Sequence, residues 1–335
     1  MKKDAQTIVP FSPMNQVSII IPTYNRAGFL LHAVQSVLAQ TFQDFEIIIV
    51  DDGSTDNTAQ LIHALQEPRI RYLTQSNQGV AAALNRGWRA AKGTYIGRID
   101  SDDAWLPTLL ERLVPVLERD TTFGAVYARA QGMDASGQTL PQLTGAPERF
   151  PGETLKSLVY GDFVTPIAVI IQRAALESVG GYDESLPGTE DWDLWIRLAP
   201  YYGIAYVPEI LARYRYHANN LTRAGSERMT RLMQDRLRIL DKFFAQQNIP
   251  SDILAIKSTA YRNVYLDWTI RSLEAKQRRA AARTFRRAYA LAANPFTFGV
   301  RALAMAAYYL YLSKTRWGVA LVDQLVARRR RTTDA

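Results

Sequence analysis

The feature that most constrains the fold of this chain is a regular alternation of apolar runs and amphipathic stretches over residues 17–99. Val17–Ile21 is rich in β-branched residues and is closed by Pro22, which cannot donate a hydrogen bond to a sheet, so it predicts a buried strand ending at residue 21. Residues 27–40 repeat apolar side chains at three- and four-residue spacing, which predicts a helix. Strands alternating with helices form parallel βαβ units, whose ligands bind beyond the carboxyl ends of the strands. Further strands are expected at 45–50, 70–73 and 95–99, and further helices up to about residue 66 and over 79–91.

The pattern changes from residue 107 onward. It predicts a helix to about Arg119, a strand over 124–130, a Gly- and Pro-rich loop over 131–152 and a strand-like run over 165–171. A helix is expected to begin near Glu190, and helices are expected over 225–247, 250–274 and 276–293. We therefore expect an α/β fold with a Rossmann-like, mostly parallel central sheet flanked by helices, followed by a helical extension. The expected divisions are an N-terminal arm (1–15), a catalytic domain (16–220) and a helical C-terminal region (221–335).

Composition excludes some chemistry and locates the positive charge. The chain has no cysteine, so disulfides, zinc-thiolate sites and thiol nucleophiles are excluded. Residues 1–270 carry 26 Lys+Arg and 29 Asp+Glu, a net charge of −3, whereas residues 271–335 carry 14 and 3, a net charge of +11. The basic character of the chain therefore belongs to its C-terminal part.

The basic C-terminal segment suggests a membrane surface as a partner. Its longest apolar run, residues 300–312, is too short to span a bilayer and is interrupted by Arg301. An interfacial Trp317 and nearby cations suit a helix lying on an anionic surface, so we expect residues 296–331 to attach there; the alternative is a helix packed on the catalytic domain with a solvated basic end. The N-terminus lacks a signal-peptide core, so we expect a cytoplasmic protein, peripheral at the inner face of the membrane, without a nucleic-acid partner.

The strongest chemical signal is an acidic cluster directly after the predicted strand that ends at residue 99. Asp100, Asp102 and Asp103 would repel one another unless a cation neutralised them. Residues two apart in extended backbone project to the same side, so Asp100 and Asp102 could bind one Mg²⁺ or Mn²⁺ together with a diphosphate. The alternative is a simple cap of the following helix, for which one carboxylate would suffice.

Polar residues also follow the first two predicted strands. Asp52 could accept the ring N–H of a uracil or thymine, and Thr23 and Tyr24 could hydrogen-bond and stack on a base. Asp52 could equally cap the next helix with Asp51 and Asp56, and Thr23 and Tyr24 could be ordinary turn residues. About ninety residues after the acidic cluster, residues 190–195 (EDWDLW) place three acids at a helix start, where one carboxylate could act as a general base or all could merely favour the helix dipole.

Taken together, these segments resemble the family 2 glycosyltransferases of the GT-A fold. The resemblance spans about residues 16–217 and rests on the order and spacing of several short segments rather than on any single one. The segments are SIIIPTYNR (18–26), QTF (40–42), EIIIVDDGSTD (46–56), NQG (77–79), DSDD (100–103), GGYDE (180–184) and EDWDL (190–194).

The resemblance implies an inverting, metal-dependent transfer of a sugar from a nucleoside diphosphate donor to an acceptor hydroxyl of a glycan or lipid-linked oligosaccharide. Asp52 favours a UDP- or dTDP-linked donor, although guanine donors occur among relatives. Asp191 would be the base, Asp100 and Asp102 would hold Mn²⁺ or Mg²⁺ and the diphosphate, and His217 would contact the metal or diphosphate, although a lone histidine is more often a structural hydrogen-bonding residue. The nucleoside side of the donor would contact Pro22, Thr23, Tyr24 and Asp52.

One departure from the family pattern concerns the diphosphate. Many members carry Ala-Arg-Asn after the Asn-x-Gly segment, whereas this chain has Ala-Leu-Asn at 83–85, so Arg98, Arg86 or Arg89 is expected to substitute for the missing arginine. Two other functions remain open: a nucleotide-sugar-binding or scaffold protein without turnover, and a sugar nucleotidyltransferase, although PTYNR lacks the Gly-rich loop usual in the latter. Dinucleotide dehydrogenases, P-loop enzymes, serine hydrolases and zincins are disfavoured because their motifs are absent.

Overall fold

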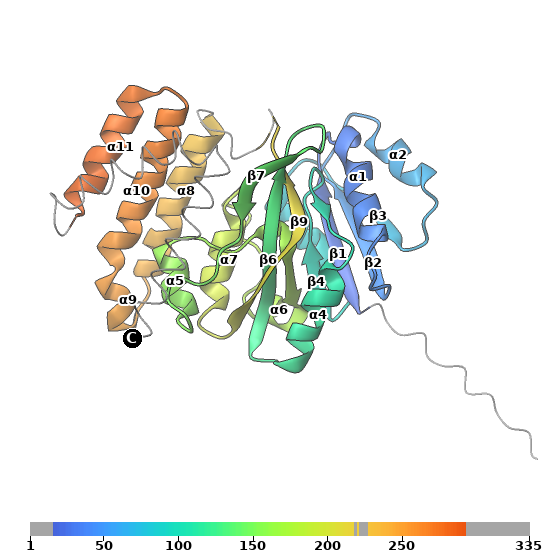
Figure 1. Ribbon diagram of the computed structural model, residues 1–335, viewed down its shortest axis with the longest axis horizontal. Coiled ribbons are helices and arrows are strands. Elements are labelled where there is room, and N and C mark those ends of the chain that lie inside the picture. The colour runs from blue at the N-terminus through green and yellow to red at the C-terminus, as the bar shows by residue number, and fades with distance from the viewer. Residues whose placement is uncertain (1–15, 218–219, 221–226, 293–335) are drawn as a thin grey trace, which may run out of the picture.

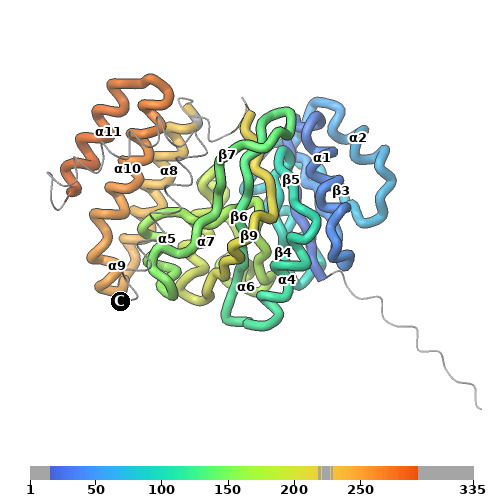
Figure 2. The backbone as a smooth tube through the Cα atoms, viewed as in Figure 1, coloured from blue at the N-terminus to red at the C-terminus, as the bar shows by residue number. Residues whose placement is uncertain are grey.

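The computed structural model describes residues 16–217, 220 and 227–292. The expected N-terminal arm (1–15) and the segment expected to meet a membrane (296–331) lie outside the described residues. The chain forms an α/β structure with a curled central sheet flanked by helices and a set of C-terminal helices beside it, as expected (Figures 1 and 2). None of the helices in the described residues is long and apolar enough to cross a bilayer.

The first half of the chain follows the predicted alternation closely. Its parallel strands pair in the order β3-β2-β1-β4, with Ile19 opposite Ile47 and Ile20 opposite Arg98. The elements are β1 (Val17–Thr23), α1 (Ala27–Leu38), β2 (Phe45–Asp51), α2 (Thr58–Ala64), β3 (Ile70–Thr74), α3 (Val80–Ala90) and β4 (Tyr95–Arg98).

The predicted end of the first strand at residue 21 is wrong, because β1 runs through Pro22 to Thr23. Backbone groups two residues apart on a strand face the same neighbour. The Ile20 carbonyl accepts from the Ile99 N–H, so the Pro22 nitrogen also faces the β4 side, beyond the last paired residue of β4, Arg98. No ladder donor is needed there, and proline is tolerated.

Within the described residues, the second half extends the sheet to nine strands with mixed pairing. β8 is antiparallel to both β4 and β6, β9 runs parallel to β6, and β5 and β7 pair antiparallel with β9 and β6. Its elements are β5 (Ala104–Trp105), α4 (Leu109–Arg119), β6 (Phe123–Met133), β7 (Thr139–Thr144), α5 (Thr154–Tyr160), a 3-10 turn (Pro166–Ala168), β8 (Val169–Gln172), α6 (Arg173–Ser178), α7 (Glu190–Leu198) and β9 (Gly203–Arg215).

Several of these elements were missed by the sequence analysis. The predicted loop at 131–152 contains the end of β6 and all of β7, and β5, α5, α6 and β9 were not predicted. The C-terminal helices are α8 (Glu227–Phe244), α9 (Ser251–Ala255), α10 (Lys257–Glu274) and α11 (Arg278–Ala290), so the single helix expected over 250–274 is interrupted at Ile256.

Alternate residues of the central strands build a separate core on each face of the sheet. Ile20 and Ile48 face α3 and α7, whereas Ile19 and Ile47 face α1 and α4. The first core continues without interruption into the C-terminal helices. Its members there include Ile239, Leu240, Phe243, Ile253, Ala260 and Val264.

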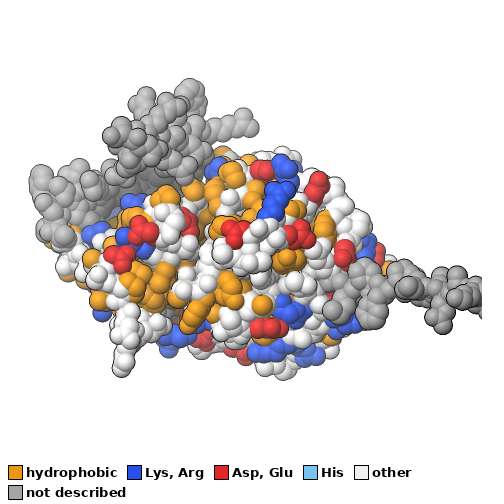
Figure 3. All heavy atoms as spheres, turned by 90° about the horizontal axis from the view of Figure 1, so that it is seen from below, with side chains coloured by type: hydrophobic (Ala, Val, Ile, Leu, Met, Phe, Trp, Pro, Cys, Tyr) orange, Lys and Arg blue, Asp and Glu red, His pale blue; other side chains and the backbone are white. Residues whose placement is uncertain are grey.

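The two edges of the sheet differ in character. The amino ends of β1 and β6 lie at the bottom in Figure 1, and Figure 3 views this edge, where acidic and basic side chains are interspersed with hydrophobic ones. A cavity of about 490 Å³ opens near the start of β6 and β9, lined among others by Lys156, Tyr201 and Ile253. Asp52 and the acidic cluster of Asp100, Asp102 and Asp103 follow the carboxyl ends of β2 and β4, at the opposite edge of the sheet.

Candidate active site

The structure brings Asp102 and His217 together. The loop after β4 carries Asp102, and the chain leaving β9 carries His217, whose Nε2 lies 2.8 Å from Asp102 Oδ2. Phe29 at the start of α1 stacks on the His217 ring with 5.0 Å between ring centroids, and Arg26 Nε lies 3.7 Å from Asp102 Oδ2. Segments 115 residues apart thus meet at one carboxylate. The family resemblance implied a common metal or diphosphate for Asp102 and His217, whereas their spacing in the chain predicted no direct contact.

Asp100 faces a different partner. Arg98 Nε donates to Asp100 Oδ1 at 3.1 Å, and Arg98 Nη1 lies 3.0 Å from Glu190 Oε1 at the start of α7. Arg98 and Glu190 are buried, whereas Asp100 is partly exposed. Burial raises the pKa of Glu190 to about 7, against the opposing effect of Arg98 and with Asp191 and Asp100 adding to the rise. The buried arginine therefore bridges the acidic loop and α7.

Asp191, the expected base, lies at this junction. Its Oδ1 accepts the Trp192 backbone N–H at 2.8 Å, and Glu190 beside it is fixed by Arg98. Burial raises the pKa of Asp162, in the loop after α5, to about 7, and the Asp191 charge adds to this rise, whereas Arg236 of α8 opposes it. Asp162 and Glu190 are thus further carboxyls near Asp191, and no spacing in the sequence marked Asp162.

The nucleoside-side residues gather at the ends of β1 and β2. Thr23 is buried and its Oγ1 has no hydrogen-bond partner in the described structure, whereas Tyr24 is 46% exposed. Asp52 Oδ1 accepts from the Gln78 N–H and the Gln75 side chain, and its Oδ2 accepts from the Gly79 N–H, each at 2.8 Å. Asp52 therefore holds the loop before α3 and does not cap α2, the helix that follows it.

Asp103 is buried and holds the acidic loop in place. Its Oδ1 accepts the Arg215 N–H at 2.7 Å, which ties the acidic loop to the end of β9. Burial raises the pKa of Asp103 well above its usual range, and Asp102 and Asp100 add to the rise.

The donor set can be compared with the needs of a divalent cation. The carboxylates of Asp100 and Asp102 are partly exposed, and the His217 imidazole touches the second. Within the described residues, no group of three or more acidic or imidazole side chains forms a closed metal cage. Mg²⁺ sites of nucleotide enzymes use one or two carboxylates and complete their shell with phosphate and water. The residues present fit a cation that arrives with a diphosphate.

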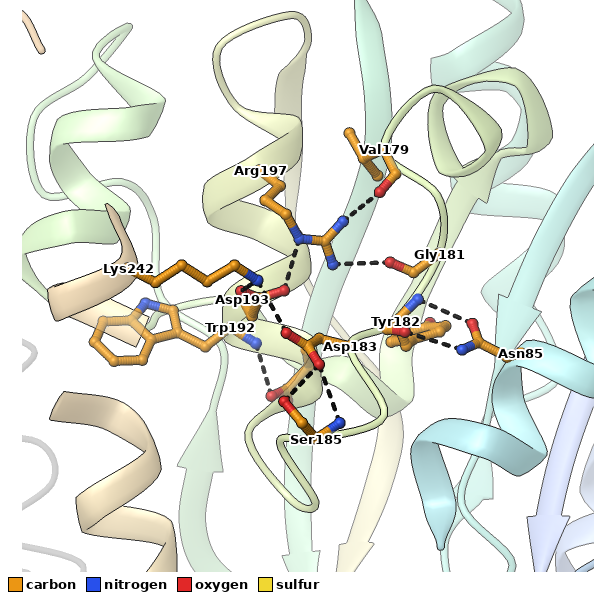
Figure 4. A network of polar contacts seen from close by, with 11 residues as sticks. Asn85, Val179, Gly181, Tyr182, Asp183, Ser185, Trp192, Asp193, Arg197 and Lys242 are labelled. Carbon is orange, nitrogen blue, oxygen red and sulfur yellow. Dashed lines mark hydrogen bonds and ion pairs between the residues drawn. The ribbon is translucent and has the colours of Figure 1, made fainter. Parts of the chain in front are cut away.

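A network of ionic contacts holds α7 against α8 and the GGYDE segment (Figure 4). Asp193 is buried and receives Arg197 Nε at 2.6 Å and Lys242 Nζ at 3.1 Å. Lys242, on α8, also reaches Asp183 Oδ2 at 2.9 Å. Arg197 donates to the carbonyls of Val179 and Gly181. Of the three acids in the EDWD segment, Asp193 is therefore a structural one.

Asn85, which stands in the Ala-Leu-Asn departure, is also structural. Its side chain donates to the Tyr182 carbonyl at 2.9 Å and accepts the Tyr182 N–H at 2.9 Å (Figure 4). Trp88 Nε1 donates to the same amide oxygen. Asn85 therefore ties α3 to the GGYDE segment (180–184).

The three arginines expected to replace the missing one lie in different settings. Arg98 is held between Asp100 and Glu190, while Arg86 and Arg89 are exposed on α3. Arg26, which the sequence analysis did not consider, is the guanidinium next to Asp102. Arg26 directly follows PTYN at the end of β1, and this position at a strand end could have marked it as a candidate site residue.

Comparisons with known proteins agree with this architecture. The family model "Glycosyl transferase family 2" matches residues 18–179. An uncharacterized glycosyltransferase of Nostoc sp. is 34% identical over 226 residues, covering 63% of this chain and 68% of that protein. One of Rickettsia prowazekii is 33% identical over 222 residues, covering 63% and 67%. Chondroitin synthase of Escherichia coli is 29% identical over 206 residues, covering 61% of this chain and 29% of that protein.

Solved structures share the fold at lower identity. Mannosyltransferase PcManGT from Pyrobaculum calidifontis, in complex with GDP-Man and Mn²⁺, superposes with a TM-score of 0.59 at 20% identity and covers 92% of this chain and 86% of that one. Staphylococcus aureus TarS 1–349, in complex with UDP-GlcNAc, superposes with a TM-score of 0.53 at 17% identity, covering 81% and 89%. From the sequence matches, with the fold in agreement, the chain belongs to the family 2 glycosyltransferases.

Proposed function

We propose that this glycosyltransferase is metal-dependent and inverting, and that it moves a sugar from a UDP- or dTDP-linked donor to the hydroxyl of a glycan or lipid-linked acceptor. The observation that carries the proposal is the convergence, at one sheet edge, of the Asp102–His217 pair, Asp100 and Asp191. A leaving-group site and a base must lie together for a direct displacement. The structure of PcManGT with GDP-Man and Mn²⁺ supports the same assignment for the cation by analogy.

On the donor side, Asp100 and Asp102 would hold Mn²⁺ or Mg²⁺, and His217 would complete the contact with the metal or diphosphate. The cation would stabilise negative charge on the departing diphosphate. Arg26 would add a second positive charge beside Asp102, in place of the arginine that the family pattern has where this chain has Leu84. The buried, unpartnered Thr23 Oγ1 supports a polar ligand at the end of β1.

At the nucleobase, Asp52 would act with Pro22, Thr23 and Tyr24. Asp52 Oδ2 accepts a single protein hydrogen bond, and a carboxylate oxygen can accept a second from a ring N–H. Tyr24 offers an exposed aromatic face on which a base could stack.

On the acceptor side, Asp191 would remove the proton of the attacking hydroxyl as the new glycosidic bond forms. The bond from the anomeric carbon to the diphosphate oxygen breaks on the opposite side, and its electron pair leaves with the diphosphate. Attack from that side inverts the anomeric carbon, and no covalent enzyme intermediate is needed.

A donor screen tests the proposal. Calorimetry with UDP, dTDP and GDP, each with and without Mn²⁺, is expected to show metal-dependent binding of a uracil or thymine nucleotide. Asp191→Asn is expected to retain this affinity and to lose release of nucleoside diphosphate from the donor sugar, by about 100-fold or more. Asp252→Asn, on the remote α9 and 52% exposed, is the matched control. Absence of metal-dependent nucleotide binding by the unmodified protein would overturn the proposal.

Assays for release of nucleoside diphosphate and of pyrophosphate separate the rival functions. A nucleotide-sugar-binding or scaffold protein would bind donor but release no diphosphate, so Asp191→Asn would have no activity to remove. A sugar nucleotidyltransferase would form pyrophosphate from a nucleoside triphosphate and a sugar phosphate. The expected attachment of residues 296–331 to an anionic membrane remains part of the proposal.

A further inference from the structure

Helix α11 carries an unusual concentration of positive charge. Between Lys276 and Ala290 the sequence has six basic residues and no acidic one. Most soluble helices mix both signs on their exposed face, so a run of one sign calls for an explanation. The six are Lys276, Arg278, Arg279, Arg283, Arg286 and Arg287.

The charge lies on the face of α11 that points away from the protein. Ala281, Thr284 and Ala288 are buried toward α10, and Thr284 Oγ1 lies 2.8 Å from Thr269 Oγ1 of that helix. Arg279, Arg283 and Arg286 follow at spacings of four and three, so they form one stripe on the opposite face, where all three are exposed. In Figure 1, α11 is the outermost of the C-terminal helices, with α10 between it and α8.

This stripe has no acidic counterpart in the part of the chain that the structure describes. None of the ion pairs there involves Arg278, Arg279, Arg283 or Arg286. Among the described residues no acidic side chain pairs with the stripe, and residues 293–335 add seven basic and two acidic residues to the charge of the chain. The stripe is therefore available to an anionic partner.

We infer that the stripe Arg279–Arg283–Arg286 is a docking surface for an anionic lipid bilayer. The surface potential of such a bilayer attracts exposed cations, and adjacent arginines on a helix bind its phosphate groups together. The neighbouring Tyr289 is 44% exposed and suits the level of the lipid headgroups. Small exposed Ala282 and Ala290 on the same side allow close approach.

A lipid surface explains these observations better than a nucleic acid does. Residues 1–270, which hold the catalytic fold, have a net charge of −3 and would be repelled by a long polyanion lying across them. A planar bilayer can meet the outermost helix without lying across the catalytic fold. The inference rests on the membrane attachment in the proposed function, which it extends to described residues of α11, and it does not depend on which sugar is transferred.

Vesicle sedimentation of the full-length protein tests the inference. The probes are vesicles of phosphatidylcholine alone and vesicles that also contain phosphatidylglycerol. The triple variant Arg279→Gln, Arg283→Gln, Arg286→Gln is expected to lose about 100-fold in affinity for the anionic vesicles, at about fivefold per arginine. Glutamine keeps the helix propensity, and circular dichroism checks the fold. The control triple Lys92→Gln, Arg112→Gln, Arg119→Gln removes the same charge from exposed positions elsewhere and is expected to bind as the unmodified protein does.

Three results would overturn the inference. The first is failure of the unmodified protein to bind the anionic vesicles in preference to the neutral ones. The second is equal binding by the Gln triple and the unmodified protein, since another segment would then carry the attachment. The third is displacement of the protein from vesicles by a short DNA duplex that binds it more tightly, which would assign the stripe to nucleic acid. A triple Arg→Lys variant that retains vesicle binding would support the role of charge if the Gln triple folds poorly.

Discussion

At the residue scale, Arg26 is the position at which the structure most changes the expected chemistry. It lies 3.7 Å from Asp102, while the arginines suggested by the sequence are either held by two acids, as Arg98 is, or exposed on α3. We expect Arg26→Gln to weaken UDP binding about 10-fold in the presence of Mn²⁺, as for loss of one charge-assisted hydrogen bond. Calorimetry measures this, with Arg119→Gln as the control. A loss that appears in Arg86→Gln instead would move the diphosphate contact to α3.

Asp162 gives a pH-dependent prediction at the same scale. Its pKa is raised to about 7 by burial and by Asp191, against the effect of Arg236, so the folded protein holds a proton there that the unfolded chain releases above about pH 4. Stability contributed at this position is therefore lost as pH rises from about 4 to 7. Asp162→Asn cannot ionise, so the substitution is expected to raise the melting temperature. The rise is expected to be a few degrees larger at pH 8 than at pH 5. Thermal denaturation at both pH values checks this; the exposed Asp252→Asn is expected to show no such difference, and an equal effect at both pH values would contradict the raised pKa.

The site residues that the sequence predicted and those it missed differ in a physical way. Asp100 and Asp102 are close in the chain, and the rule that ligands bind at strand ends places them at the site directly. Asp52 was singled out by the same rule, but its hydrogen bonds to Gln75, Gln78 and Gly79 depend on a loop whose path no local pattern describes. The contact between Asp102 and His217 forms only when the whole sheet is folded. The spacing of these residues in the chain therefore cannot predict it.

At the element scale, two acidic residues of α7 bind cations on two different neighbouring elements. Glu190 at its start binds Arg98 of β4, and Asp193 one turn later binds Lys242 of α8. Both acids stand in one short segment with Asp191. The family resemblance named Asp191 as the base, but no pattern in the sequence distinguished the bridging Glu190 from the structural Asp193. The fold separates these roles by pointing Glu190 and Asp193 at different neighbours.

The Lys242 contact can be tested by removing the cation. Lys242→Met leaves Asp193, which is buried, with Arg197 as its remaining ionic partner and removes the contact with Asp183. We expect a loss of about 1–2 kcal/mol of folding free energy, since Lys242 itself is half exposed. Transfer is expected to fall while donor affinity is unchanged, because α7 carries Asp191. Arg238→Met, on the same helix and 69% exposed, is the matched control with little expected effect; a fall in donor affinity without loss of transfer would contradict the assignment.

Secondary structure was predictable where periodicity was strong and not where it was mixed. The buried strands β1, β2 and β4 and the amphipathic α1 were predicted to within a few residues. β9 was missed because exposed and half-buried residues alternate irregularly along it, and Pro208 and Glu209 lie inside it. Its register with β6 shifts at several points, which breaks the two-residue period on which strand prediction relies.

At the scale of the whole molecule, the core joins parts that the sequence divided. A boundary near residue 220 was expected because the strands end there and helices follow. Ile239, Leu240 and Phe243 of α8 belong to the same core as Ile20 and Ile48 of the sheet. Composition shifts indicate where element types change, and they carry no information on which apolar faces become buried together.

This continuity predicts that the sheet and the C-terminal helices unfold together. A chain with one shared core loses both parts in a single transition, whereas two domains with a thin interface melt separately. We expect calorimetry of the full chain to show one endotherm, in which the sheet and helices α8 to α11 unfold together. A fragment ending at residue 220 would expose the apolar surface that α8 and α10 cover, so it is expected to aggregate or to lack near-ultraviolet circular dichroism. Two resolved endotherms would contradict this prediction. A stable fragment that binds UDP with Mn²⁺ as the full chain does would also contradict it, because the catalytic fold would then form without the C-terminal helices.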